Sequence, residues 1–147
     1  MTGLITLAQI IKETDISPVP FTKVYSPDND FLIVPDPDNT FRLDADRAES
    51  LCDRDTGVGA DEILRVVPTA TVAGYEADAE VAPWFMDNRN ADGSLSDVCG
   101  HSLRIFARYL LDKGLAQPGE FRVATRAGVR TVRVPEHGNF LVGTNTP

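Results

Sequence analysis

Residues 99–114, CGHSLRIFARYLLDKG, carry apolar side chains on nearly every side of the helix that their spacing predicts. These apolar residues are Leu103, Ile105, Phe106, Ala107, Tyr109, Leu110 and Leu111. Because a helix that is apolar all round must be buried, the segment predicts a central helix from about Gly100 to Lys113, ending before Gly114. Arg108 and Asp112 are four residues apart and can pair on its exposed face.

Outside this helix, strand patterns outnumber helical ones. The predicted strands are Phe21–Val24, Phe31–Val34, Ile63–Val67, Trp84–Met86, Phe121–Thr125, Val129–Val134 and Phe140–Val142. Asp44 caps a second predicted helix through Cys52, 68–83 reads as an exposed connection, and 87–97 reads as a polar stretch. The pattern predicts an α+β domain, with a mostly antiparallel sheet or barrel wrapped around the central helix, about residues 100–113.

The first 17 residues stand apart from the rest of the chain. Leu4, Leu7 and Ile10 have helical spacing, and Pro18 ends the pattern. We therefore expect a short helical N-terminal extension over residues 1–17 and one domain over residues 18–147, which is a common domain size.

Composition limits the kinds of binding partner and the cellular compartment that we expect for this chain. Asp and Glu outnumber Lys and Arg by 22 to 14, and a net charge of -8 makes nucleic acid an improbable partner because phosphates are repelled. The two cysteines, Cys52 and Cys99, lack CxxC spacing, which predicts reduced thiols and a cytoplasmic location. The apolar run Leu4–Ile11 has no basic leader and is too short to span a bilayer, so we expect no membrane association.

Cys99 is the candidate for chemistry because it precedes the central helix. The first amides of a helix lack intrahelical partners, and together with the helix dipole they favour an anion such as a thiolate. A thiol there can gain and lose a proton in general acid–base chemistry. The alternative interpretation is that Cys99 is a small buried hydrophobic residue, as most free cysteines are. Cys52 lies within a predicted helix, where packing is its expected role, and no cysteine–histidine spacing indicates a metal site.

The segment that leads into this helix carries a family resemblance. Asn90-Ala-Asp-Gly-Ser94, Cys99-Gly100 and the helix that follows resemble the first-cysteine motif of diaminopimelate epimerases. Asn29-Asp30-Phe31 and Gly57-Val-Gly-Ala-Asp61 resemble two further segments of that family. Order and spacing agree over roughly residues 19–147.

The resemblance implies a fold of two pseudo-symmetric α/β domains, each wrapped around a central helix, with the substrate between them. It implies that one cysteine removes the α-proton of LL-diaminopimelate and that a cysteine of the second domain returns a proton to the opposite face. The product would be meso-diaminopimelate, in lysine biosynthesis, with no pyridoxal phosphate or other cofactor. On this sequence the catalytic thiol would be Cys99, and the substrate-binding residues would be Asn29, Asn90, Gly100, His101 and Ser102. Asn29 and Asn90 also adjoin turn signals, where asparagine often serves backbone geometry alone.

Several positions depart from the family pattern. His101-Ser102 replaces the usual Asn-Gly after Cys99-Gly100, Tyr25-Ser26 replaces His-Gly, and Glu62 replaces glycine or glutamine. The 147 residues hold no second cysteine motif and no substrate-binding Glu-Arg pair.

Three hypotheses follow. The first is the N-terminal portion of a diaminopimelate epimerase, inactive alone and completed by a second epimerase domain. The second, suggested by His101, Ser102 and Glu62, is a non-catalytic domain of the same fold that binds a ligand or partner. The third is a homodimer in which each Cys99 serves one face of the substrate.

Overall fold

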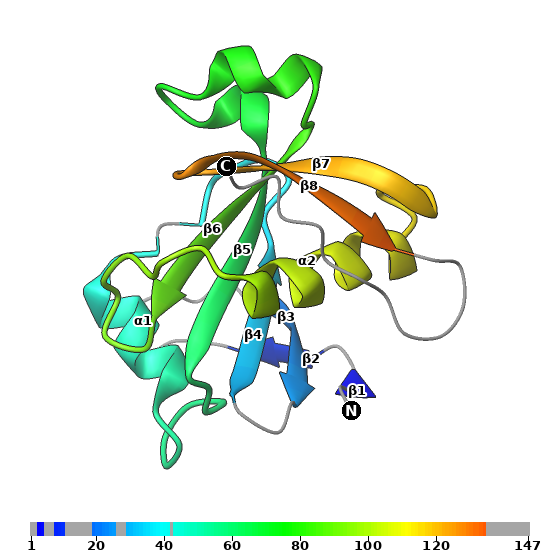
Figure 1. Cartoon of the computed structure of the whole chain (residues 1–147). Coiled ribbons are helices and arrows are strands. Elements are labelled where there is room, and N and C mark those ends of the chain that lie inside the picture. Colours follow the sequence, from blue (N-terminus) through cyan, green and yellow to red (C-terminus); the bar gives the residue numbers. More distant parts are fainter. Residues whose placement is uncertain (1–2, 5–7, 11–18, 26–28, 42, 135–147) are drawn as a thin grey trace. The chain divides into compact units, whose positions relative to one another are not determined.

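The computed structural model describes all residues except 1–2, 5–7, 11–18, 26–28, 42 and 135–147 (Figure 1). The chain divides into two compact units. The first unit comprises Met1–Val66 and Asn88–Ser96, and the second comprises Val67–Asp87 and Asp97–Pro147. The expected α+β class is confirmed, because each unit combines strands with one α-helix.

Antiparallel and parallel strands meet in the first unit. Its elements are β1 (Gly3–Leu4), β2 (Ala8–Ile10), β3 (Val19–Tyr25), β4 (Asp30–Pro35) and α1 (Ala45–Cys52), with the first part of β5 (Glu62–Pro68) and the end of β6 (Trp84–Asn90). β3 pairs antiparallel with β1, β2 and β4, whereas β4 pairs parallel with β5, from Phe31 opposite Glu62 to Pro35 opposite Val66. β5 and β6 are hydrogen-bonded neighbours, and each unit contains one end of both strands.

The helix predicted within residues 1–17 is wrong where the structure describes that segment. Gly3–Leu4 and Ala8–Ile10 are strands, and both pair with β3. The apolar spacing of Leu4, Leu7 and Ile10 suits a helix, but pairing with a strand beyond Pro18 satisfies the backbone hydrogen bonds instead. Such a long-range partner leaves no local signal in the sequence.

Helix α1 forms where the sequence predicts it. The Asp44 carboxylate accepts a hydrogen bond from the Arg47 backbone N–H at 2.9 Å, which satisfies one of the unpaired amides of the first turn. The buried side of α1 joins an apolar core with residues of β3, β4 and β5. That core contains Phe21, Leu32, Val34, Leu43, Ala48, Leu51, Cys52, Ala60 and Ile63.

The second unit contains the central helix, α2 (Gly100–Asp112). Its other elements are the 3₁₀ turns η1 (Thr69–Thr71) and η2 (Glu76–Glu80), the ends of β5 and β6, β7 (Gly119–Thr125) and β8 (Gly128–Val134). β7 and β8 form an antiparallel hairpin, and α2 packs beside β8 (Figure 1). Of the seven apolar residues predicted to be buried, Leu111 is half-buried and the other six are buried. These six are Leu103, Ile105, Phe106, Ala107, Tyr109 and Leu110.

Two further predictions can be compared with the structure here. The ion pair between Arg108 and Asp112 is confirmed, with Nε and Oδ1 3.2 Å apart. The polar stretch expected from residue 87 is wrong at its start, because β6 continues to Asn90. Asp87 is buried and pairs with Arg126 at 2.6 Å, so its charge is compensated rather than solvated.

The described strands do not close into a barrel; their pairing is mixed and ends at β1 and β8. The strand predicted over Phe140–Val142 lies outside the described residues. In the part of the chain that the structure describes, no helix is both long and apolar enough to cross a membrane.

Candidate functional site

The predicted site residues divide between the two units. Asn29 and Asn90 belong to the first unit, whereas Cys99, Gly100, His101 and Ser102 belong to the second.

Cys99 is the N-cap residue of α2. Its backbone is extended, with φ −131° and ψ 166°, and its Sγ accepts a hydrogen bond from the Ser102 backbone N–H at 3.5 Å. In return, the Cys99 backbone N–H donates to Ser102 Oγ at 3.4 Å. These reciprocal bonds form a capping box in which sulfur and a serine hydroxyl take the usual places of an oxygen cap and a glutamate.

Exposure differs sharply over these four residues. Cys99 and Gly100 are exposed, His101 is half-buried, and Ser102 is wholly buried. A Cβ at Gly100 would meet no atom within 4 Å, so the backbone there is open to approach. An exposed thiol therefore stands beside helix amides that lack intrahelical partners, an arrangement that suits an anionic group.

Cys52, the other thiol of the chain, has the opposite environment. It is the last residue of α1 and is buried in the apolar core of the first unit. Burial, with a smaller contribution from the negative charge of Asp61, raises the pKa of Cys52 from 9.0 to about 11. The expected packing role is confirmed, and Cys52 is a poor acid–base group near neutral pH.

Asn90 holds a tight turn at the end of β6. Its Nδ2 donates to Ser94 Oγ at 3.0 Å, and its backbone carbonyl accepts from the Gly93 N–H at 2.9 Å. Hydrogen bonds from the Ser94 hydroxyl and backbone N–H lower the pKa of Asp92. Gly93 has φ +88°, and a Cβ there would lie 2.5 Å from Ala45 Cα. The turn thus requires glycine because it lies against the start of α1.

Asn29 is held by Glu62. Its Nδ2 donates to Glu62 Oε2 at 3.1 Å, and Ser96 Oγ donates to Glu62 Oε1 at 3.0 Å. Ser96 is itself fixed by Asn88, whose Nδ2 donates to the Ser96 carbonyl at 3.1 Å. Glu62 therefore links the segment before β4 to the segment that follows the Asn90 turn.

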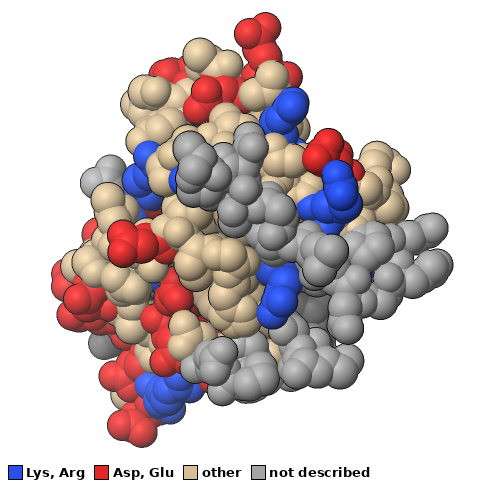
Figure 2. All heavy atoms as spheres, viewed as in Figure 1, with Lys and Arg blue, Asp and Glu red and all other residues tan. Residues whose placement is uncertain are grey.

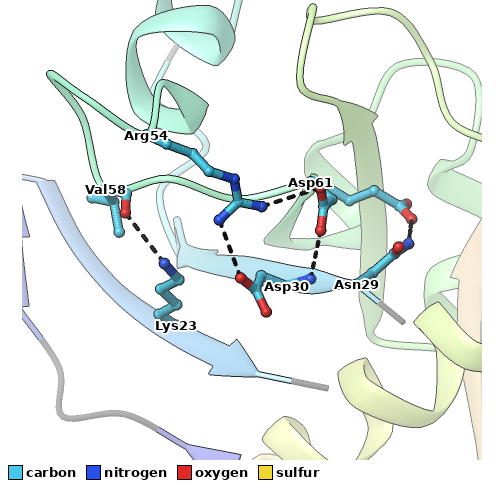
Figure 3. A network of polar contacts seen from close by, with 7 residues as sticks. Lys23, Asn29, Asp30, Arg54, Val58 and Asp61 are labelled. Carbon is cyan, nitrogen blue, oxygen red and sulfur yellow. Dashed lines mark hydrogen bonds and ion pairs between the residues drawn. The ribbon is translucent and has the colours of Figure 1, made fainter. Parts of the chain in front are cut away.

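A second polar cluster lies beside this link (Figure 3). Arg54 bridges two carboxylates, with Nη1 3.2 Å from Asp30 and Nη2 3.1 Å from Asp61. The Asp30 backbone N–H also donates to Asp61 Oδ2 at 2.8 Å, and Lys23 Nζ donates to the Val58 carbonyl at 3.3 Å. The hydrogen bond to Asp30 is the main reason that the pKa of Arg54 is raised. The cluster fixes the turn after α1 against the strands that flank Asn29.

No local pattern in the sequence predicts these partners. Glu62 stands out only as a departure from the family pattern, and no motif contains Ser96 or Arg54. Glu62 and Ser96 are more than twenty positions apart in the sequence, and so are Arg54 and Asp30. The sequence signals that could have predicted these contacts are the opposite charges and the hydroxyl near the ends of neighbouring strands.

Acidic side chains dominate the surface around α1 and the loop after it (Figure 2). The exposed acids there are Asp44, Asp46, Glu49, Asp53 and Asp55. No group of three or more His, Cys, Asp or Glu side chains is arranged to hold a metal ion among the described residues.

Comparison with known proteins identifies the family. The sequence profile described as Diaminopimelate epimerase matches residues 21–147. A relative named diaminopimelate epimerase from Thermobifida fusca is 48% identical over 126 residues, covering 83% of this chain and 46% of the relative. Relatives of the same name from Streptomyces coelicolor and Corynebacterium glutamicum are 44% and 47% identical, covering 85% and 79% of this chain and 43% and 41% of their own lengths.

The chain thus spans about half the length of the curated relatives it matches. The matched region contains both the Asn29–Glu62 link and the head of α2. On this evidence the chain belongs to the diaminopimelate epimerase family.

Proposed function

We propose that this chain is the N-terminal portion of an epimerase that interconverts LL- and meso-diaminopimelate in lysine biosynthesis. The observation that carries the proposal is the exposed Cys99 thiol at the N-cap of the buried helix α2. The names of the relatives supply the substrate class.

In the proposed reaction, the Cys99 thiolate takes the α-proton, and the electron pair of the C–H bond stays on the substrate, delocalised into its carboxylate. Amides at the start of α2, beginning with that of Gly100, would stabilise this developing charge. A second thiol then delivers a proton to the opposite face. Asn29, Asn90 and His101 would bind the polar groups of the substrate, and Ser102 would stand beside the reacting thiol.

A second thiol is the part that this chain does not supply. Its cysteines are Cys52 and Cys99, and Cys52 is buried with a raised pKa. We infer that a second epimerase domain completes the site and that the 147 residues are inactive alone. A cytoplasmic location, where thiols stay reduced, agrees with this chemistry.

The test measures exchange of the α-proton of LL-diaminopimelate in D₂O by NMR, together with formation of the meso isomer. The chain alone should show neither. Adding the C-terminal half of the Thermobifida fusca relative should restore both, and Cys99→Ser should abolish them while Cys52→Ser leaves them unchanged. Enzyme-like exchange and epimerisation by the chain alone would disprove the half-site assignment.

The contact between Glu62 and Asn29 favours a second candidate function, a non-catalytic domain that binds another ligand or partner. Glu62 adds a carboxylate beside a predicted substrate-binding amide and accepts its hydrogen bond at 3.1 Å. A carboxylate near a dicarboxylate substrate disfavours binding. Calorimetric titration of the complemented chain with diaminopimelate distinguishes the two functions, because only the epimerase should bind it.

The third arrangement, a homodimer with one Cys99 on each face of the substrate, predicts a different mass in solution. Sedimentation velocity over a wide concentration range would detect such a dimer. A monomer at every concentration would exclude it.

A further inference from the structure

The Ser102 hydroxyl accepts a hydrogen bond from the Cys99 thiol. The two atoms are 3.5 Å apart, and Ser102 is wholly buried whereas Cys99 is exposed. The family resemblance implies that Ser102 binds substrate. Its buried hydroxyl, which makes three hydrogen bonds with Cys99, is evidence for a different role.

The hydrogen-bond directions describe a resting arrangement. Ser102 Oγ donates its proton to the Cys99 carbonyl at 3.1 Å and accepts from the Cys99 backbone N–H at 3.4 Å and from the thiol at 3.5 Å. A hydroxyl has one proton and two acceptor sites, so this arrangement uses its full capacity. It suits the protonated thiol, which needs an acceptor.

A thiolate needs donors instead. The Ser102 backbone N–H already points to the sulfur at 3.5 Å. Rotation about the Cβ–Oγ bond would turn the hydroxyl proton from the carbonyl to the sulfur, giving the thiolate a second donor. Hydroxyl protons rotate readily in this way, because their position is not fixed by the heavy atoms.

We propose that Ser102 is a positioning residue that holds the Cys99 sulfur in both of its protonation states. This proposal rests on the proposed function only because it assigns proton transfer to Cys99. When the thiolate takes a proton from the substrate α-carbon, the new S–H bond points to Ser102 Oγ, and the hydroxyl proton turns back to the Cys99 carbonyl. Ser102 neither gains nor loses a proton, and the C–H electron pair stays on the substrate.

A purely structural role is the alternative, since Ser102 also completes the capping box of α2. The two roles differ in how they depend on pH. Loss of a donor to the thiolate matters where thiol and thiolate compete, and it matters little where all sulfur is ionised. Loss of the cap alone would loosen the helix start at every pH.

The experiment measures the rate of Cys99 alkylation by iodoacetamide from pH 6 to pH 10 in a Cys52→Ser background, with intact mass as the readout. Ser102→Ala should slow alkylation about tenfold at pH 7, the equivalent of one hydrogen bond to a charged group, and change it less than about twofold at pH 10. Ser102→Thr, which keeps a hydroxyl, should restore the rate at pH 7. Ser50→Ala, an exposed serine in α1, is the matched control and should have no effect.

Thermal unfolding of each variant separates folding from chemistry, and Ser102→Gly provides a second hydroxyl-free variant of small volume should the alanine variant fail to fold. An unchanged rate at pH 7 in a folded hydroxyl-free variant would overturn the proposal, as would an equal change at pH 7 and pH 10. Failure of Ser102→Thr to restore the rate would also count against it. Alkylation needs neither substrate nor a second domain, so this result is independent of whether the complemented chain epimerises diaminopimelate.

Discussion

The two cysteines of this chain lie at different kinds of helix end. Cys52 is the last residue of α1, whereas Cys99 is the N-cap residue that precedes α2. At the end of α1 the sulfur is buried among apolar side chains near the Asp61 carboxylate, which disfavours its ionised form. At the start of α2, Cys99 is exposed and its sulfur accepts a hydrogen bond from the Ser102 backbone N–H. Burial, neighbouring charge and position along the helix therefore place two cysteines in opposite environments: Cys52 packs in the apolar core, whereas Cys99 is exposed beside the first amides of a helix.

The largest expected effect is the difference in reactivity between these two thiols. At pH 8, a pKa of about 11 leaves roughly one in a thousand Cys52 side chains as thiolate, the reactive form. Cys99 should therefore be alkylated by iodoacetamide at least about a hundredfold faster than Cys52. Peptide mass spectrometry after timed labelling measures both sites in one sample. Similar rates at the two positions would contradict the comparison.

Gly57→Ala should reduce the difference in reactivity between the two thiols, because it opens the turn that covers the end of α1. A Cβ at Gly57 would lie 1.9 Å from the Ser50 carbonyl oxygen, so the backbone must move. We expect the free energy of unfolding to fall by about 3 kcal/mol and Cys52 alkylation to accelerate. Urea unfolding and timed labelling test both effects.

Gly74→Ala is the control for that variant. A Cβ at Gly74 meets no atom within 4 Å, although its φ of +91° disfavours alanine. A loss of about 1 kcal/mol with unchanged Cys52 labelling is expected. Equal losses for the two variants would show that the close approach at Gly57 is unimportant.

Cys52→Ala should sharpen the comparison through the pH dependence of stability. The folded chain holds the Cys52 proton more tightly than the unfolded chain, because burial raises this pKa from 9.0 to about 11. This contribution to stability is complete below about pH 9 and is lost as the pH rises toward 11. Urea unfolding from pH 8 to pH 11 should show a shallower decline for Cys52→Ala than for the native chain.

Tyr109 contributes in the same pH range, since burial also raises its pKa. The difference between the native and Cys52→Ala curves removes this shared part. Parallel curves for native chain and Cys52→Ala would contradict the assigned environment of Cys52.

Arg54→Gln should give the smallest effect. Arg54 lowers the pKa of Cys52, opposing the larger effects of burial and Asp61, so its removal should slow Cys52 alkylation at pH 8. The change should be less than about twofold, because the guanidinium is solvent-exposed and its field is screened. The same labelling measurement in 1 M NaCl should show no difference between variant and native chain.

Local signals in the sequence were sufficient for the helices. The N-cap at Asp44 and the bounds of α2, expected over about Gly100 to Lys113 and observed over Gly100–Asp112, follow from periodicity and capping within a few residues. The same signals placed Cys99 at a helix start. The sequence could not predict that Gly3–Leu4 and Ala8–Ile10 are strands or that β6 extends to Asn90, because strand pairing depends on distant segments.

The features of the candidate site also divide into those that local sequence signals predict and those that depend on distant segments. The sequence by itself determined the family, the Cys99 thiol and the glycine turns, since each depends on residue type and short spacing. Only the tertiary structure decided that Glu62 binds Asn29 and Ser96, that Cys52 is buried with a raised pKa, and that Ser102 is wholly buried. Burial and long-range hydrogen bonds depend on how strands and loops far apart in the chain pack together, which no local pattern specifies.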